Sequence, residues 1–126
     1  MIFLLDTHVL IWTIYDPDKL PDTLRQDIED PSTALCFSSI SALEISIKQS
    51  LGKLELDLSA LLKEAQHIGI EEHPFKAIHA LPMLNLPPIH ADPFDRALIA
   101  QAMVENFTLV TRDETIQKYP VTQRWL

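Results

Sequence analysis

The sequence predicts an α/β fold in which helices cover both faces of a mostly parallel β-sheet. Short apolar runs typical of buried strands alternate along the chain with segments of helical periodicity. Such alternation is typical of strand–helix–strand units, whose crossover connections make neighbouring strands parallel. The chain has 126 residues, 47% of them hydrophobic, so we expect one domain, residues 1–126, with a substantial core.

Four elements are expected first, in the order strand, helix, helix, strand: residues 2–6, 7–15, 21–29 and 34–39. The first is a continuous apolar run, the second has helical spacing until DPDKLPD ends it, and Pro21 fits the first turn of the third. The strand ALCFSS leads into a longer helix, SALEISIKQSLGKL. Ser41 can cap that helix, and Glu44 follows three residues later, as a capping box requires.

The middle of the chain predicts a helix over residues 59–68, which Gly69 ends, and then a short edge strand over residues 70–73. The segment FKAIHALPML is expected to be helical until Pro82 interferes, because proline lacks the backbone N–H that a helix interior needs. NLPPIHADP is expected to be a loop.

The clearest helix is DPFDRALIAQAMVEN, with Asp92 as its N-cap and Pro93 at its first helical position. Its expected apolar stripe is Leu98, Ile99, Ala102 and Met103. FTLVT, residues 107–111, is then a strand, Asp113 opens a short helical turn, and VTQRW is a last edge strand. The sheet should therefore have four to five strands.

Composition excludes several classes of protein. Only two glycines occur, which nearly excludes a glycine loop that cradles phosphate, and the single Cys36 excludes an intrachain disulfide and a cysteine-rich zinc site. The apolar N-terminus has no basic lead-in, and no stretch approaches the ~20 apolar residues of a membrane span. We therefore expect a soluble, cytoplasmic protein with no membrane segment. Its formal charge of −8 opposes long-range attraction of nucleic acid and would attract a basic protein partner.

Four acids stand at the ends of expected elements: Asp6, Glu44, Asp95 and Asp113. Asp6, Glu44 and Asp113 follow parallel-type strands, so they should share the edge of the sheet at which such folds bind ligands. Asp95 joins them only if its helix begins near that edge. Carboxylates that lie close together repel one another, which makes each harder to ionise. A bound Mg²⁺ or Mn²⁺ ion offsets this repulsion with its positive charge. We expect these four acids to hold such an ion.

Each acid also has a purely structural interpretation. Asp6 can cap the first helix, and Asp113 can cap the turn that follows it. Asp95, in the first turn of its helix, can interact favourably with the positive end of the helix dipole. Glu44 can complete a capping box and pair with Lys48 four residues later. The four acids taken together, rather than any one of them, favour the metal site.

Four further residues are candidate substrate contacts: Thr7, Ser38, Lys48 and Thr111. The threonines could instead orient acids, Ser38 could serve turn chemistry, and Lys48 could be solvated. His8 is expected to be packed or partly exposed. Four other histidines show no metal-ligand spacing: His67, His73, His79 and His90. Trp12 and Tyr15 are expected to be packing residues.

Four segments, LLDTHVLIW, SALEISIK, DPFDRALIAQA and LVTRDE, resemble the PIN-domain family, and specifically the VapC-type toxins of toxin–antitoxin pairs. The resemblance implies an α/β/α sandwich and a Mg²⁺- or Mn²⁺-dependent ribonuclease. It places the family's acids on Asp6, Glu44, Asp95 and Asp113, of which the last is the most variable in the family. It also implies an RNA substrate, a homodimer, and a small antitoxin that inserts a basic segment into the acidic cleft.

Two other classes of function remain as alternatives. A magnesium phosphatase could use Asp6 as a covalent nucleophile, but phosphatases of the haloacid dehalogenase type carry a second acid two residues later, where this chain has His8. A catalytically inert acidic module could use the same residues to dock a basic partner. Titration with Mn²⁺ separates this last interpretation from a nuclease, because only real metal binding stabilises the fold by mass action.

Overall fold

The structure is a computed structural model that describes residues 1–125, and its centre is a five-stranded sheet with the strand order β3-β2-β1-β4-β5. The strands are β1 (Ile2–Leu5), β2 (Ala34–Ser38), β3 (Glu71–His73), β4 (Thr108–Thr111) and β5 (Gln123–Trp125). Every neighbouring pair is parallel. The predicted α/β class and the parallel sheet are confirmed, with β3 and β5 at the edges as expected.

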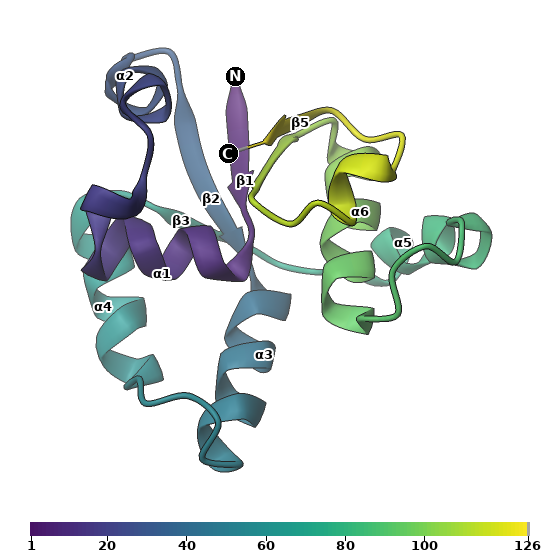
Figure 1. The fold of residues 1–126 in the computed structure, drawn as a ribbon, viewed down its shortest axis with the longest axis horizontal. Helices are drawn as coiled ribbons and strands as arrows, with labels where there is room; N and C mark the ends of the chain where they lie inside the picture. Colours follow the sequence, from purple (N-terminus) through teal and green to yellow (C-terminus); the bar gives the residue numbers. More distant parts are fainter. Residues whose placement is uncertain (126) are drawn as a thin grey trace.

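Helices lie on both faces of this sheet (Figure 1). The α-helices are α1 (Thr7–Tyr15), α2 (Asp22–Glu29), α3 (Ser39–Ser50), α4 (Leu58–Ile68), α5 (Ala77–Ala80) and α6 (Pro93–Glu105). Three short 3-10 helices join them: η1 (Pro17–Lys19), η2 (Leu81–Asn85) and η3 (Ile116–Lys118). In Figure 1, α1 and α4 lie to one side of the strands and α6 to the other, while α3 extends beyond one end of the sheet.

Alternation along β1 divides the core into two. Phe3 and Leu5 point to one face, where they pack with residues of α1, α2 and α4 such as Leu10, Leu24 and Leu61. Leu4 points to the other face and belongs to the cluster built around α6. Because both faces of the sheet are covered, the strands read as continuous apolar runs rather than alternating ones.

Three predictions about helices were wrong in detail. The third helix begins at Ser39 with Ser38 as its N-cap, so Ser41 is not the cap and Glu44 lies in the second turn rather than in a capping box. Ser41 is instead fully buried. Met103 is 39% exposed and does not belong to the apolar stripe.

The segment around Pro82 is helical for only four residues, α5, before it tightens into the 3-10 helix η2, in which Pro82 occupies the first turn. Three predicted signals are confirmed. Asp92 caps α6 by accepting from the backbone N–H of Phe94, and Pro93 is its first residue. Gly69 ends α4 in the left-handed conformation, with φ of +87°.

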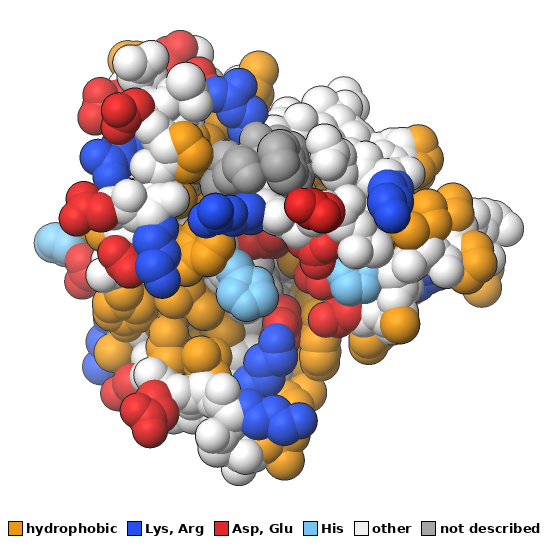
Figure 2. Space-filling view, viewed as in Figure 1, with side chains coloured by type: hydrophobic (Ala, Val, Ile, Leu, Met, Phe, Trp, Pro, Cys, Tyr) orange, Lys and Arg blue, Asp and Glu red, His pale blue; other side chains and the backbone are white. Residues whose placement is uncertain are grey.

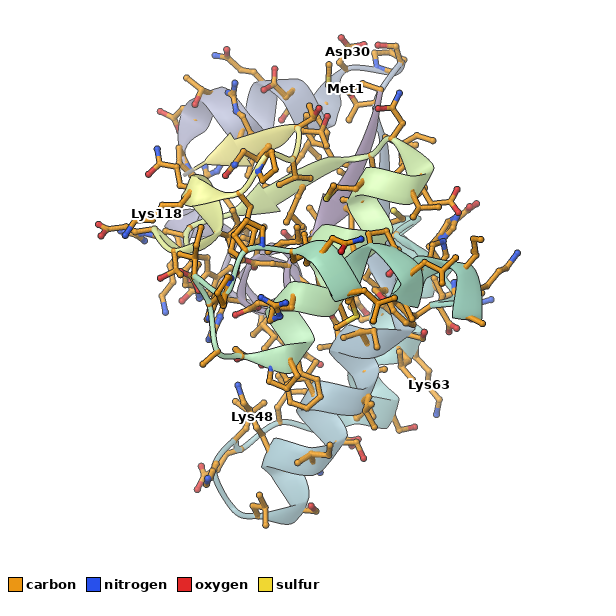
Figure 3. All side chains as sticks on the ribbon, turned by 90° about the vertical axis from the view of Figure 1, so that its right-hand side faces the viewer. Met1, Asp30, Lys48, Lys63 and Lys118 are labelled. Atoms are coloured by element: carbon orange, nitrogen blue, oxygen red, sulfur yellow. The ribbon has the colours of Figure 1, made fainter. Side chains whose placement is uncertain are left out.

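Parallel pairing places the carboxyl ends of the strands at one end of the molecule. In Figure 3, Met1 and Asp30 mark the end at which β1 and β2 begin, and Lys48 on α3 marks the opposite end. Asp6, Glu44 and Asp113 follow β1, β2 and β4 respectively and so lie toward the second end. Among residues 1–125, no helix is long and apolar enough to cross a membrane.

Candidate metal centre at the carboxyl end of the sheet

Asp6 is the first residue after β1, and both of its carboxylate oxygens have partners. Oδ1 accepts from the backbone N–H of Val9 at 2.8 Å and caps α1, as the structural interpretation of this acid predicted. Oδ2 accepts from the Thr111 hydroxyl at the end of β4, at 2.5 Å. The side chain is 5% exposed, so it is a buried acid held in a fixed orientation at a strand end.

Asp95 and Asp113 come together on one imidazole. Asp95 lies in the first turn of α6 and Asp113 lies two residues after β4. The Nε2 atom of His90 lies 2.9 Å from Oδ2 of each carboxylate. One ligand atom from each of these three residues lies within 4.8 Å of the others, a separation that one cation could span.

The acids share a recess with two residues of α1 and with Arg112, which follows β4. A cavity of about 390 Å³ is lined by Asp6, His8, Trp12, Asp95, Arg112 and Asp113. Asp95 therefore does join the edge marked by Asp6 and Asp113, because α6 begins there. Figure 2 looks onto this face, where red carboxylates and pale blue histidines gather near the centre with blue cations to either side.

The electrostatics of the recess differ from acid to acid. Burial, helped by the charges of Asp92, Glu44 and Asp6 and opposed by that of His90, raises the pKa of Asp95 to about 7. Burial also raises the pKa of Asp6, against the hydrogen bond from Thr111. These two carboxyls are ionised at a cost in free energy that an added positive charge would remove.

Asp113 differs from its neighbours because it is the most exposed of the three and has its own donors. Burial is the largest single effect on Asp113 and would raise its pKa, but the hydrogen bonds with His90 and Thr115 and the charge of His90 together outweigh it and hold that pKa below its usual range. For His90, burial lowers the pKa, whereas the hydrogen bond to Asp113 and the charge of Asp95 raise it by more. His90 thus serves as the local counter-charge of the two acids.

Glu44 does not line this recess. It lies on α3 with only 3% exposure, where Oε1 accepts from the Thr7 hydroxyl at 2.7 Å and Oε2 meets the Lys48 ammonium at 2.5 Å. The pairing with Lys48 predicted from their spacing is confirmed, and the hydrogen bond to Glu44 raises the pKa of Lys48. The charge of Glu44 is close enough to raise the pKa of Asp95. Glu44 therefore stands behind the recess, paired with Lys48.

Three of the candidate substrate contacts are buried and have protein partners. Thr7 donates to Glu44, Thr111 donates to Asp6, and the Ser38 hydroxyl accepts from the backbone N–H of Ile40 as the cap of α3. Both threonines therefore orient acids, which was the alternative that the sequence left open. Contact of Thr7, Ser38, Lys48 or Thr111 with substrate remains a prediction.

His90 belongs to this site although the sequence did not identify it as a site residue. It lies in the loop that precedes α6, five residues before Asp95, and its spacing matches no metal-ligand pattern. The loop is fixed from outside: Tyr119 Oη accepts from the His90 N–H and donates to the Pro87 carbonyl, both at 2.8 Å. Arg96 also donates to the Pro87 carbonyl, at 2.9 Å. The signal that could have found His90 is its position just before a helix with an acid in its first turn.

The donor set suits a hard divalent cation. The carboxylates of Asp95 and Asp113 both contact the imidazole of His90, and the carboxylate of Asp6 lines the same recess as these two acids. Mg²⁺ and Mn²⁺ prefer carboxylate oxygens, and Mn²⁺ also tolerates an imidazole ligand. Within residues 1–125, the group whose ligand atoms lie close enough together to share one ion is His90, Asp95 and Asp113.

Comparison with known proteins identifies the family. The sequence model of the PIN-domain family matches residues 3–121 of this chain. The chain belongs to the PIN-domain family. A curated relative, Ribonuclease VapC22 of Mycobacterium tuberculosis, is 31% identical to this PIN domain over 129 aligned positions, which cover 94% of this chain and 95% of the relative. The resemblance to VapC proteins that the four segments indicated is therefore confirmed.

Solved structures support the fold of this PIN domain. VapBC2 from Rickettsia felis, bound to a promoter DNA fragment, gives a TM-score of 0.74 at 19% identity and covers 98% of each chain. VapBC-1 from nontypeable Haemophilus influenzae gives 0.67 at 16% identity and covers 99% of this chain and 98% of that one. At such low identity these likenesses show that the α/β/α architecture is shared.

Proposed function

We propose that this PIN-domain protein is a Mg²⁺- or Mn²⁺-dependent endoribonuclease that acts as the toxin of a toxin–antitoxin pair. The observation that carries the proposal is the convergence of Asp6, Asp95 and Asp113 on one recess with His90 between two of them. The relative that covers nearly the whole chain is named a ribonuclease, which supports the same reaction.

The proposed roles follow from the positions of the side chains. Asp6, Asp95 and Asp113 hold the cation, and Glu44, which stands behind the recess, acts on it through water. Thr111 and Thr7 fix the rotamers of Asp6 and Glu44 by donating hydrogen bonds to them. When bound, the ion supplies a water of lowered pKa and neutralises charge on the phosphodiester. The expected products are a 5′-phosphate and a 3′-hydroxyl, and the protein supplies no nucleophile.

The proposal extends to protein partners. The solved neighbours from three bacteria are VapBC assemblies, and this chain carries a net charge of −8 with three carboxylates lining its recess. A small antitoxin with a basic segment would complement both features and neutralise the same acids as the metal. We further propose that the toxin is a homodimer and works in the cytoplasm.

The test replaces Asp6 by asparagine. Asp6→Asn keeps an oxygen that can cap α1 and removes the charge that would bind metal, so the fold should persist while Mn²⁺-dependent cleavage of RNA and growth inhibition fall at least a hundredfold. Asp57→Asn is the matched control, because Asp57 caps α4 in the same manner and lies outside the recess. Cleavage by a folded Asp6→Asn protein at the parental rate would refute the proposal.

A further inference from the structure

The recess that holds the acids has a second wall, which the metal proposal does not use. Besides the acids it is lined by His8, Trp12 and Arg112. The guanidinium carbon of Arg112 lies 5.7 Å from the centroid of the Trp12 ring, within the distance of a cation–π contact. The imidazole of His8, an exposed residue, lies 6.2 Å from the same ring. An aromatic ring with a cation over it therefore stands in the same recess as three carboxylates.

The position of Arg112 is set by its neighbours in sequence. It lies between Thr111, whose hydroxyl binds Asp6, and Asp113, which binds His90. The backbone that carries the guanidinium is therefore fixed by the same contacts that fix the acids. Asp113 also receives the backbone N–H bond of Thr115 and donates its own N–H to Thr111, which holds the turn closed.

An arginine at this position can offset the repulsion between the acidic site and the phosphates of RNA. The chain has a net charge of −8, and its carboxylates repel the phosphates on either side of the bond to be cleaved. A guanidinium over a ring leaves N–H donors at its edge, where they can bind phosphate oxygens in pairs. The contact with Trp12 also restricts the side chain in advance, so less entropy is lost when phosphate binds.

We propose that Arg112, held over Trp12, binds a phosphate of single-stranded RNA next to the phosphate that is cleaved. This inference rests on the proposed ribonuclease function and names the part of the substrate that the recess recognises. Arg112 is the binding residue, and Trp12 positions it. Single-stranded RNA is the expected class because its backbone and unstacked bases can enter a recess, whereas an A-form duplex presents its phosphates on a convex surface and keeps its bases stacked.

The chain supplies a matched control for this contact. Lys19 also lies over the Trp12 ring, with its ammonium 5.7 Å from the centroid. It lines a neighbouring recess together with Ile11 and Leu54, and it does not line the one that contains the acids. Lys19→Ala and Arg112→Ala each remove one positive charge and one cation–π contact with Trp12. Lys19→Ala also removes an exposed ion pair with Asp16, which lies outside the recess that contains the acids.

The experiment measures binding and cleavage of one short, fluorescein-labelled single-stranded RNA. Binding is followed by fluorescence anisotropy with Ca²⁺ in place of Mn²⁺ over a series of salt concentrations, and cleavage is followed with Mn²⁺. Arg112→Ala should weaken binding about tenfold and reduce the slope of log K against log salt by about 0.7, the value for one phosphate contact on a single strand. KM should rise more than kcat falls. Lys19→Ala should leave the slope unchanged.

The role of Trp12 is tested by Trp12→Leu, which keeps an apolar side chain against the core and removes the ring. Its effect should be smaller than that of Arg112→Ala and should vanish in the Arg112→Ala background, since a positioning residue acts only through the residue that it positions. Equal slopes for Arg112→Ala and Lys19→Ala, with cleavage intact, would overturn this inference and leave the ribonuclease proposal standing. Failure of the parent chain to bind or cleave RNA would overturn both.

Discussion

Replacing Asp95 by asparagine should stabilise the metal-free protein and at the same time abolish its stabilisation by Mn²⁺. The Asp95 side chain is only 18% exposed, and burial, helped by the charges of Asp92, Glu44 and Asp6, raises its pKa to about 7. The ionised carboxylate is therefore unfavourable in the folded protein. Asparagine has nearly the same shape and carries no charge, so it removes this cost together with the metal ligand.

The size and pH range of the effect follow from linkage. The unfolded chain releases this proton near 3.8 and the folded protein near 7, a difference that corresponds to about 4 kcal/mol. The destabilisation is absent below about pH 4, grows up to about pH 7 and is complete above it. Asparagine loses the attraction of His90 and is still a buried polar group, so we expect a net gain of about 2 kcal/mol near pH 8, or about 8 °C in Tm, and almost none near pH 4.

Thermal unfolding followed by circular dichroism in EDTA, and again in excess Mn²⁺, tests both halves of the prediction. At a Mn²⁺ concentration of about 100 Kd the parent should gain about 2.7 kcal/mol, and Asp95→Asn should gain little. Asp57→Asn is again the control, because Asp57 lies outside the recess. A lower Tm for Asp95→Asn in EDTA near pH 8 would contradict the electrostatic reasoning. A parent that Mn²⁺ does not stabilise would favour the inert acidic module.

Three smaller predictions follow, two on the support of the site and one on the end of α4. Lys48→Met leaves the buried Glu44 carboxylate without its cation and should cost about 2 kcal/mol in urea unfolding, whereas a loss below about 0.5 kcal/mol would mean that Thr7 alone satisfies it. Tyr119→Phe removes the hydroxyl that holds the His90 loop; we expect a loss of about 1–2 kcal/mol and slower Mn²⁺-dependent cleavage, and an unchanged Tm would contradict this. Gly69→Ala should lower the free energy of unfolding in urea by about 1–2 kcal/mol, because φ is +87° at this position. No atom lies within 4 Å of the added Cβ, so a much larger loss would show that packing rather than backbone strain sets the cost of the substitution.

The order and type of most elements could be predicted because the signals are local. Continuous apolar runs predicted β1, β2 and β4, Asp92 with Pro93 marked the start of α6, and Gly69 marked the end of α4. Errors came where two local signals competed. Both Ser38 and Ser41 could cap α3. Ser38 is the cap because, at the end of β2, its backbone already has the extended conformation of an N-cap.

The candidate site was predictable to the extent that strand topology placed it. Parallel strands put Asp6 and Asp113 at the same edge. The position of Asp95 depended on where α6 begins relative to the sheet, which no local pattern states. His90 and Arg112 were missed as site residues because a loop histidine and a lone arginine have no periodicity. Their importance arises only from the side chains that they meet.

The amino-acid order alone determined that strands and helices alternate, that the strands run parallel, and that several acids follow them, because hydrophobic period and capping act over a few residues. Tertiary structure alone decided which acids share a recess, that Glu44 does not line it, and that His90 bridges Asp95 and Asp113. The reason is that electrostatic interaction and desolvation depend on distances in space, and residues as far apart in sequence as Asp6 and Thr111 come within hydrogen-bonding distance only once the sheet has formed.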